Sequence, residues 1–369
     1  MFHESDIERA AVWLDRNIAV NSPFRNASPS CSRGNEAHFS SEIGRASGAS
    51  SRRLLLSKQR VKQVRDSLRG VKQAWASLRM ATMENVSFRR MTDSDLPAAH
   101  ELRRLAGWNQ TLGDWRRLLW LEPRGCFVAA QNGAVVGTVT TTTYGQALAW
   151  IGMMLVHAEH QRRGIGARLM RQALEYLQGG GVECVKLDAT PAGRPVYERL
   201  GFVPESTLTR YQRPASGQTQ APEPAAASAR ALTDADWEVV EDIDHVAFGA
   251  SRACLLRSLA HDSRAVLVWP AQGRVVGWGM VRPGANADYL GPLVCSSYEG
   301  SLSLQAALLG RAGSHSVIWD VPDQNELAKT TALRFGFTPI RPLTRMRLGP
   351  ELVVGNRHYQ FAIADPALG

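Results

Sequence analysis

Residues 150–177 of this 369-residue chain read WIGMMLVHAEHQRRGIGARLMRQALEYL, and this stretch decides the fold. Its first part, Trp150–Val156, is a continuous apolar run, which is typical of a strand that is buried on both faces of a sheet. Its second part begins near Ile165, repeats apolar residues at helical spacing and ends at Gly179–Gly181. The stretch therefore predicts a strand, a short polar loop and an amphipathic helix.

The loop between these elements, Gln161–Gly166, holds two glycines where the helix begins. Glycine has no side chain, so backbone N–H groups at a helix start can approach an anion closely. The helix dipole adds a positive partial charge at the same place. The spacing differs from the Walker A motif and from the three-glycine dinucleotide motif. We interpret the loop as a phosphate-binding site of another kind.

The composition limits the class of protein. A hydrophobic content of 44% over 369 residues is enough to bury a sizeable core and suggests two domains or more. No apolar run approaches the length of a membrane span. The five cysteines are scattered without paired or metal-ligand spacing. We therefore expect a soluble cytoplasmic protein with no metal site.

The net charge of +9 is unevenly distributed. Residues 1–85 carry 14 Lys or Arg against 8 Asp or Glu, whereas the rest of the chain carries 29 against 26. The basic character therefore belongs mostly to an N-terminal extension. No aromatic and basic platform accompanies this charge, so we expect no nucleic-acid partner.

The N-terminal extension itself has two parts. Residues 1–53 are rich in Ser, Arg, Asn and Gly, and we expect them to be largely disordered. Residues 54–80 have the pattern of a basic amphipathic helix, interrupted by Gly70. Such a helix lies on its own domain or is an inessential extension, or else it contacts a partner or a membrane surface. We prefer the first interpretation.

From Val86 the pattern becomes regular and predicts the order β-α-α-β-β-β-α-β-α-β. The residues at Thr92–Asp95 have the form of a capping box before a helix. Asn132-Gly133 is a strong hairpin turn between two strands. The remaining predicted elements are a helix over Gly113–Leu121, a buried strand over Glu183–Ala189, a short helix around Val196–Leu200 and a last strand that ends near Tyr211.

After a linker rich in Pro, Ala and Ser, residues 214–228, the pattern repeats. Four segments recur in the same order at offsets that drift from 141 to 135. They are Thr92–Asp95 with Thr233–Asp236, Gly133–Gly137 with Gly273–Gly277, Trp150–Gly152 with Tyr289–Gly291, and Gly201–Pro204 with Gly336–Pro339. We infer a tandem duplication of one fold.

The second copy lacks the glycine loop. Where the first copy has Gln161–Gly166, the second reads Ser296–Ser301, with an acid in place of the arginines. The offset also drops by four across this interval. The second copy has therefore lost the anion site of the first.

The loop and the element order together resemble the GNAT superfamily of N-acetyltransferases, whose Q/R-x-x-G-x-G/A segment matches Gln161, Gly164 and Gly166. The resemblance covers residues 86–213 and implies an α/β fold built on a mixed sheet. With the repeat, it implies two tandem GNAT-like acyl-CoA acyltransferase domains, residues 86–213 and 229–349. Residues 350–369 form a C-terminal tail.

The resemblance implies an acetyl-CoA cosubstrate and the residues that hold it. The pyrophosphate binds the loop, and the pantetheine arm lies along the backbone of the strand before it. An asparagine that is common in the family is Thr190 here, which puts that contact in doubt. The implied contacts are Met154, Leu155, Val156, Gln161, Arg162, Arg163, Gly164, Ile165, Gly166, Ala167 and Thr190.

The resemblance also implies a proton donor. The family commonly places a tyrosine four residues before a Gly-Phe pair, and Tyr197 stands there, ahead of Gly201-Phe202. The alternative is a buried structural tyrosine. The second copy shows the reverse pattern, with Asn325 at the asparagine position and Ala332 in place of the tyrosine. That copy is expected to be degenerate and to have a structural or substrate-shaping role.

No general base is evident on the central strand. The candidates are His157, Asp188 and water. His157 could equally be an ordinary loop histidine, and Asp188 a hydrogen-bond acceptor at a strand end. Exposed aromatic and amide side chains between the first two helices would suit a small polar amine. The aromatic residue, Trp108, could equally be a packed core tryptophan. The tentative acceptor contacts are Trp108, Asn109, Gln110 and Trp150.

We therefore expect an N-acetyltransferase that transfers acetyl from acetyl-CoA to a primary amine. The acceptor is expected to be a small molecule, with a peptide as a further option. The second copy is expected to pack on the first, where it closes the acceptor pocket or mediates a homodimer. The alternative is a non-catalytic acyl-CoA-binding sensor or regulatory protein, which would need the phosphate loop but no proton donor.

Overall fold

The computed structural model describes residues 85–215, 229–313, 316–351 and 355–369. All of them belong to one compact unit, Ala76–Gly369. The expected disorder over residues 1–53 and the expected helix over residues 54–80 lie outside the described residues, as does most of the predicted linker.

The first copy of the repeat has the predicted order of elements. Short 3-10 helices precede the first helix, at Asp93–Asp95, and follow the central strand, at Ala158–His160. The main elements are β1 (Val86–Arg90), α3 (Leu96–Leu105), α4 (Leu112–Leu121), β2 (Phe127–Gln131), β3 (Ala134–Tyr144), β4 (Leu148–Val156), α5 (Ile165–Gly179), β5 (Cys184–Ala189), α6 (Arg194–Arg199) and β6 (Val203–Arg213).

The second copy has the same order, which confirms the inferred duplication. Short 3-10 helices lie at Asp234–Asp236 and Arg357–Tyr359. The main elements are β7 (Arg230–Ala231), α7 (Trp237–Phe248), α8 (Ala253–His261), β8 (Ala265–Ala271), β9 (Arg274–Arg282), β10 (Asp288–Cys295), α9 (Tyr298–Leu309), β11 (Val317–Pro322), α10 (Glu326–Arg334) and β12 (Thr338–Leu348), followed by β13 (Gln360–Ala362).

The predicted capping boxes are present in both copies and are built in the same way. In the first copy, the Asp95 carboxylate accepts hydrogen bonds from the backbone N–H and the hydroxyl of Thr92. Arg89 donates to both oxygens of the same carboxylate, at 2.6 and 2.7 Å, and holds the pKa of Asp95 below its usual range. Arg230 and Asp236 repeat this arrangement at 2.7 Å. The same motif thus fixes the start of the first helix in each of the two copies.

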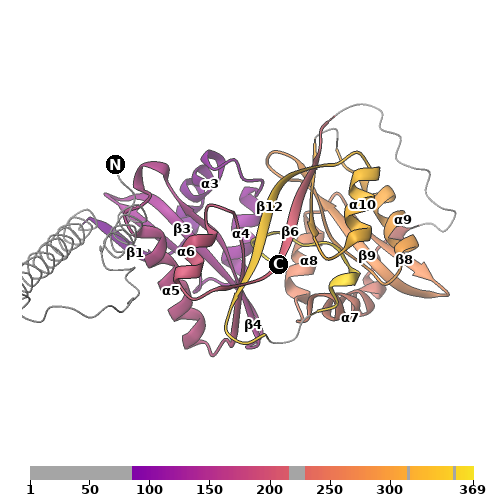
Figure 1. Cartoon of the computed structure of the whole chain (residues 1–369), viewed down its shortest axis with the longest axis horizontal. Coiled ribbons are helices and arrows are strands. Elements are labelled where there is room, and N and C mark those ends of the chain that lie inside the picture. The colour runs from indigo at the N-terminus through magenta and orange to yellow at the C-terminus, as the bar shows by residue number, and fades with distance from the viewer. Residues whose placement is uncertain (1–84, 216–228, 314–315, 352–354) are drawn as a thin grey trace, which may run out of the picture. The chain divides into compact units, whose positions relative to one another are not determined.

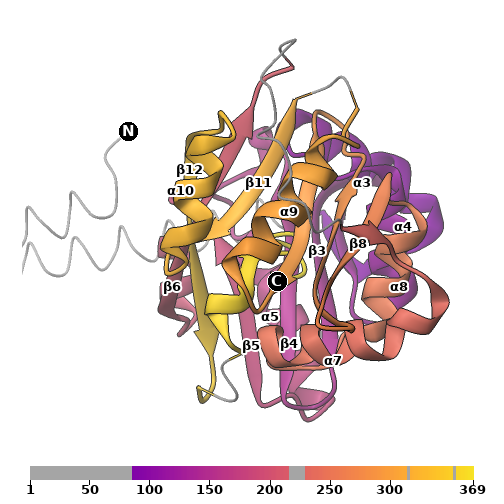
Figure 2. The same cartoon turned by 90° about the vertical axis from the view of Figure 1, so that its right-hand side faces the viewer.

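Within the described residues, thirteen strands form one mixed sheet. Along its main path the order is β1-β2-β3-β4-β5-β12-β6-β11-β10-β9-β8-β7, with β13 paired to β10. Figure 1 shows β12 and β6 side by side between the two copies, and Figure 2 shows β12, β6 and β11 from another side. The sheet therefore does not divide at the sequence boundary between the copies.

The last strands of the two copies change places. β12, the second-copy equivalent of β6, pairs with β5 of the first copy from Thr344 opposite Ala189 to Leu348 opposite Val185. β6 pairs with β11 of the second copy in the same antiparallel manner. Each copy therefore completes the central sheet of the other.

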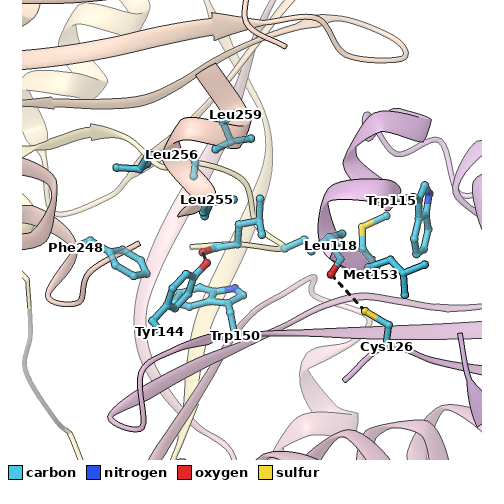
Figure 3. Packing of buried hydrophobic residues seen from close by; sticks show 14 of the residues in the cluster. Trp115, Leu118, Cys126, Tyr144, Trp150, Met153, Phe248, Leu255, Leu256 and Leu259 are labelled. Carbon is cyan, nitrogen blue, oxygen red and sulfur yellow. Dashed lines mark hydrogen bonds between the residues drawn. The ribbon is translucent and has the colours of Figure 1, made fainter. Parts of the chain in front are cut away.

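The helices cover the sheet in two ways. α5 packs on one face of the first copy, and α9 and α10 pack on the second copy. On the other face, α3, α4, α7 and α8 share one hydrophobic core that belongs to both copies. Figure 3 shows part of this core, where Phe248 of α7 lies beside Tyr144 and Trp150 of the first copy. No helix among the described residues has the length and apolar character that a bilayer crossing requires.

Candidate active site

The central strands of the first copy diverge. β4 and β5 are parallel and pair only from Leu148 opposite Cys184 to Trp150 opposite Lys186. Beyond Trp150 the register of β4 against β3 shifts at a bulge, where Met153 has a φ of +47°. A positive φ is unusual for a residue with a side chain, so the bulge is a built feature. The β5-facing edge of Met154–Val156 is left without a strand partner.

The first turn of α5 packs directly on this open part of β4. A Cβ built on Gly166 would lie 3.1 Å from Cε of Met154 and 3.6 Å from Cγ2 of Val156. A side chain at this position would therefore crowd the end of the Met154 side chain. The sequence prediction placed Met154–Val156 and Gly166 in one cofactor site, and the structure brings them together.

The start of α5 is not capped by any side chain. Gly164 is the N-cap residue with a φ of +89°, and Arg162 also has a positive φ, of +62°. Among the described residues, no hydrogen bond uses the backbone N–H groups from Arg162 to Ala167. Gln161 donates from Nε2 to the Val156 carbonyl at 3.0 Å and so ties the loop to β4. Free N–H groups at the positive end of a helix fit a phosphate group.

Tyr197 of α6 lies near the same end of the sheet. Its ring packs edge-on against Phe202 at 6.1 Å, and a Cβ built on Gly193 would lie 3.1 Å from this ring. Burial raises the pKa of Tyr197 to about 12. Among the described residues, no hydrogen bond engages its hydroxyl. Thr190 accepts a hydrogen bond from the backbone N–H of Gly193 at 3.2 Å, so it helps to start α6.

Asp188, a candidate base, is held by the exchanged strand. Arg345 of β12 donates from Nε and Nη2 to the two carboxylate oxygens, at 2.9 and 3.0 Å. The side chain of Asp188 is 0% exposed. The Arg345 guanidinium also stacks on the ring of Trp150, 4.6 Å from its centroid. Burial opposes the charge of Arg345, but the Asp188 carboxylate outweighs it and leaves the pKa of Arg345 raised.

The tentative acceptor contacts between α3 and α4 are less exposed than the sequence suggested. Asn109 and Gln110 are buried and Trp108 is half-buried. Asn109 donates to the Ala287 carbonyl and accepts from two backbone N–H groups, all at 2.9 Å. Gln110 donates to the Asp365 carboxylate at 3.0 and 3.1 Å. These side chains join the two copies, because the second copy covers the loop. Their contact with an acceptor stays a prediction.

His157 begins the turn that leads into the glycine loop. Its Nδ1 accepts a weak hydrogen bond from the backbone N–H of Glu159, at 3.4 Å. His157, Glu159 and His160 could together present three ligand atoms within 4.8 Å of one another, which is close enough for a metal ion. Glu159 is exposed and all three residues come from one turn. The expected lack of a metal stays a prediction.

The equivalent gap in the second copy is filled by the chain itself. β10 and β11 pair in parallel only from Asp288 to Leu290, and β13 then occupies the space beside β10. Asn325 donates to the backbone carbonyls of His358 and Gln360, at 3.2 and 2.9 Å, and thereby holds β13 in place.

The start of the equivalent helix α9 is also occupied. The Ser297 side chain accepts from the Gly300 N–H at 3.1 Å. The N–H groups that are free in the first copy are thus partly used in the second. Both features agree with the predicted loss of the second anion site.

Two parts of the site escaped the sequence prediction. Arg345 reaches Asp188 from 157 residues away, and the last ten residues enter the fold as an integral part. For the last ten residues, the only sequence signal is the apolar run at Phe361–Ile363, within a tail that otherwise has no recognisable pattern.

Comparison with known proteins supports one family for both copies. Residues 93–202 match the model of the acetyltransferase (GNAT) family, and residues 240–362 match an acetyltransferase (GNAT) domain. The uncharacterized N-acetyltransferase YitH of Bacillus subtilis is 25% identical over 273 residues, which are 72% of this chain and 92% of that protein. The holothin acyltransferase of a Pseudoalteromonas species is 26% identical over 71% of this chain and 87% of its own length.

Solved structures show the same fold. A putative acetyltransferase from Pyrococcus horikoshii has a TM-score of 0.65 at 24% identity and covers 78% of this chain and 96% of its own. A tandem GNAT protein from the clavulanic acid biosynthesis pathway has a TM-score of 0.54 at 17% identity, over 72% of this chain and 99% of its own. The chain therefore belongs to the GNAT family as an N-acyltransferase that uses an acyl-CoA cosubstrate and carries the family's fold twice.

Proposed function

We propose that the first copy transfers an acetyl group from acetyl-CoA to the primary amine of a small-molecule acceptor, and that the second copy binds no cofactor. One observation carries this proposal. The same scaffold occurs twice, but among the described residues no strand pairs with β4 in the gap of the first copy, whereas β13 fills the gap of the second.

The residues of the first copy suit the two ends of the cosubstrate. The free N–H groups from Arg162 to Ala167 would bind the phosphates, and the β5-facing edge of Met154–Val156, which has no strand partner, would bind the amide groups of the pantetheine arm. Acetyl-CoA supplies a thioester whose carbonyl an amine can attack once both are held in place. Gly166 at the helix start leaves room for the side chains of Met154 and Val156.

Tyr197 is proposed as the general acid. With its pKa raised to about 12, its phenol keeps its proton throughout the neutral range. Its hydroxyl is free to donate, because no described residue accepts from it or donates to it. It would donate this proton to the thiolate that leaves when the acetyl group is transferred.

For the base, the proposal favours His157 or water over Asp188. A base must be within reach of the ammonium group, whereas the Asp188 carboxylate is 0% exposed and is held by the Arg345 guanidinium at 2.9 and 3.0 Å. Within the part of the chain that the structure describes, the ring of His157 uses only Nδ1 in a hydrogen bond, so Nε2 is available. Asp188 then acts as a positioning residue that orders Arg345 and Trp150.

A small acceptor is favoured because the second copy covers the loop between α3 and α4. Asn109 is bonded to Asn286 and Ala287, and Gln110 is bonded to Asp365. An extended peptide would have to displace these contacts, whereas a compact amine would not.

The experiment is thiol release from acetyl-CoA across a panel of small amines. Tyr197→Phe should lower turnover on the order of 10²-fold, because general acid catalysis contributes that much, and should leave acetyl-CoA affinity unchanged. Tyr211→Phe is the matched control, since Tyr211 is a buried tyrosine that lies on β6 among second-copy strands, whereas Tyr197 is half-buried on α6. An unchanged rate in Tyr197→Phe would refute the assignment. Tight acetyl-CoA binding without thiol release for any amine would favour the sensor instead.

A further inference from the structure

The last ten residues run from one copy of the fold to the other. We call residues 360–369 the C-terminal segment. It begins as β13, paired with β10 through Leu293 opposite Ala362. Ile363 then donates its N–H to the Asp320 carbonyl at 3.2 Å. All ten residues are buried except Pro366, which is half-buried. The segment is therefore part of the core and not an appendage.

Its second half packs on the central strand of the first copy. Trp150 donates from Nε1 to the Pro366 carbonyl at 3.0 Å, and the Tyr144 hydroxyl donates to the Leu368 carbonyl at 2.6 Å. Figure 3 shows Tyr144 and Trp150 together in the core that both copies share. The segment thus covers the face of β4 that lies opposite α5.

The closest approach is between Ala367 and Gly152. A Cβ built on Gly152 would lie 2.6 Å from the Cβ and from the carbonyl oxygen of Ala367. The methyl group of Ala367 therefore takes the place that a side chain at position 152 would need. Gly152 stands between Trp150, the last residue of β4 paired with β5, and the bulge at Met153. Ala367 therefore covers the β4 backbone next to the point where β4 and β5 stop pairing.

The segment is held rigidly at this position. The Asp365 carboxylate accepts from Gln110 and from the backbone N–H of Ala367, the latter at 2.8 Å. The Asp365 carbonyl accepts from the N–H groups of Leu368 and Gly369, which closes a tight turn. Arg282 donates to the Ala364 carbonyl at 2.5 Å. A turn with this many internal and external hydrogen bonds is a fixed wall and not a mobile strap.

We propose that Ala367 is the wall that limits the length of the acyl group, so that the first copy accepts short-chain acyl-CoA only. This inference rests on the proposed function. If the phosphates bind at the start of α5, the acyl group points toward the inner end of the gap. There the strands pair again at Trp150 and the C-terminal segment covers Gly152. Each added methylene would meet the Ala367 methyl group.

The test is calorimetric titration of the full chain with acetyl-CoA, propionyl-CoA and butyryl-CoA. The wild type should bind acetyl-CoA most tightly and butyryl-CoA most weakly. Ala367→Gly should bind propionyl-CoA about fourfold more tightly than the wild type does, which is the factor expected for one buried methylene. The ratio of its propionyl-CoA affinity to its acetyl-CoA affinity should therefore rise above that of the wild type. Ala367→Ser, which adds a hydroxyl at the wall, should weaken propionyl-CoA binding further and serves if Ala367→Gly does not fold.

The matched control is Ala362→Gly, the same substitution in the same segment. Ala362 faces Gly291, the second-copy equivalent of Gly152, so the ratio of propionyl-CoA to acetyl-CoA affinity should not change. An unchanged ratio in folded Ala367→Gly and Ala367→Ser would overturn the wall while leaving the proposed function standing. A wild type that binds no acetyl-CoA would contradict the gap itself and the wall with it. Thermal unfolding establishes that each variant is folded.

Discussion

Arg345 of the second copy binds Asp188 of the first through two hydrogen bonds of 2.9 and 3.0 Å, and both side chains are buried. The reciprocal ion pair is also present. Arg210 of the first copy binds Asp320 of the second at 2.8 and 2.6 Å. Each arginine lies on an exchanged strand and each aspartate on the strand that receives it. The exchange of strands is therefore fixed by two reciprocal ion pairs.

Breaking either pair should destabilise the fold strongly. Arg345→Met leaves the buried Asp188 carboxylate without a partner, and we expect a loss of about 3–5 kcal/mol in the free energy of unfolding. Urea unfolding at neutral pH measures it. Arg210→Met should cost a similar amount but, unlike Arg345→Met, should leave the turnover of the remaining folded protein unchanged, because Arg210 lies away from Trp150. A loss below about 1 kcal/mol in both variants would show that the pairs do not hold the exchange.

The pH dependence of turnover follows from the raised pKa of Tyr197. A phenol is protonated below its pKa, so Tyr197 keeps its proton up to about pH 12. If the pKa of Tyr197 had the ordinary value of about 10, turnover would begin to fall at about pH 9, one unit below that pKa. We therefore expect no loss of kcat due to Tyr197 between about pH 8 and 10.

The measurement is kcat at saturating substrates across that range, for the wild type and for Tyr197→Phe. The two profiles should have the same shape at different heights. An alkaline fall that is present in the wild type and missing in Tyr197→Phe would mean that the phenol titrates normally. Such a fall would contradict the raised pKa of Tyr197.

Asn325 should matter for stability and not for cosubstrate binding. Its side chain accepts from the Ala328 N–H and donates to two carbonyls of the segment that fills the second gap. Asn325→Ala removes these bonds in a buried place, so we expect a loss of about 2–3 kcal/mol in urea unfolding. Thr190→Ala, at the equivalent position of the first copy, should cost about 1 kcal/mol or less. Equal losses, or a second acetyl-CoA site in Asn325→Ala, would contradict this role.

Sequence reasoning predicted the local elements well, because their signals are local. The capping boxes at Thr92 and Thr233 and the turn at Asn132-Gly133 depend on residues within four positions of one another. Gly164 likewise marks the start of α5, because its φ of +89° favours glycine. The duplication could be inferred for the same reason, since each local signal occurs twice.

The exchange of strands could not be predicted in this way. β6 and β12 carry the same tripeptide, Leu208-Thr209-Arg210 and Leu343-Thr344-Arg345, so either strand has the residues to pair with either sheet. Which sheet each strand joins depends on contacts between residues more than 100 positions apart. The position of the C-terminal segment in the fold could not be predicted for a related reason. Its apolar residues fill a gap that exists only once the sheet has assembled.

The central claim is that one copy of the fold binds the cosubstrate and the other does not. Titration of the intact chain with acetyl-CoA in a calorimeter tests it most directly. We expect one site per chain, lost in Gly164→Glu, which places an acid at the phosphates, and retained with weaker affinity in Gly164→Ala, which brings only the strain of the positive φ. Two sites per chain, or unchanged affinity in Gly164→Glu, would contradict the account.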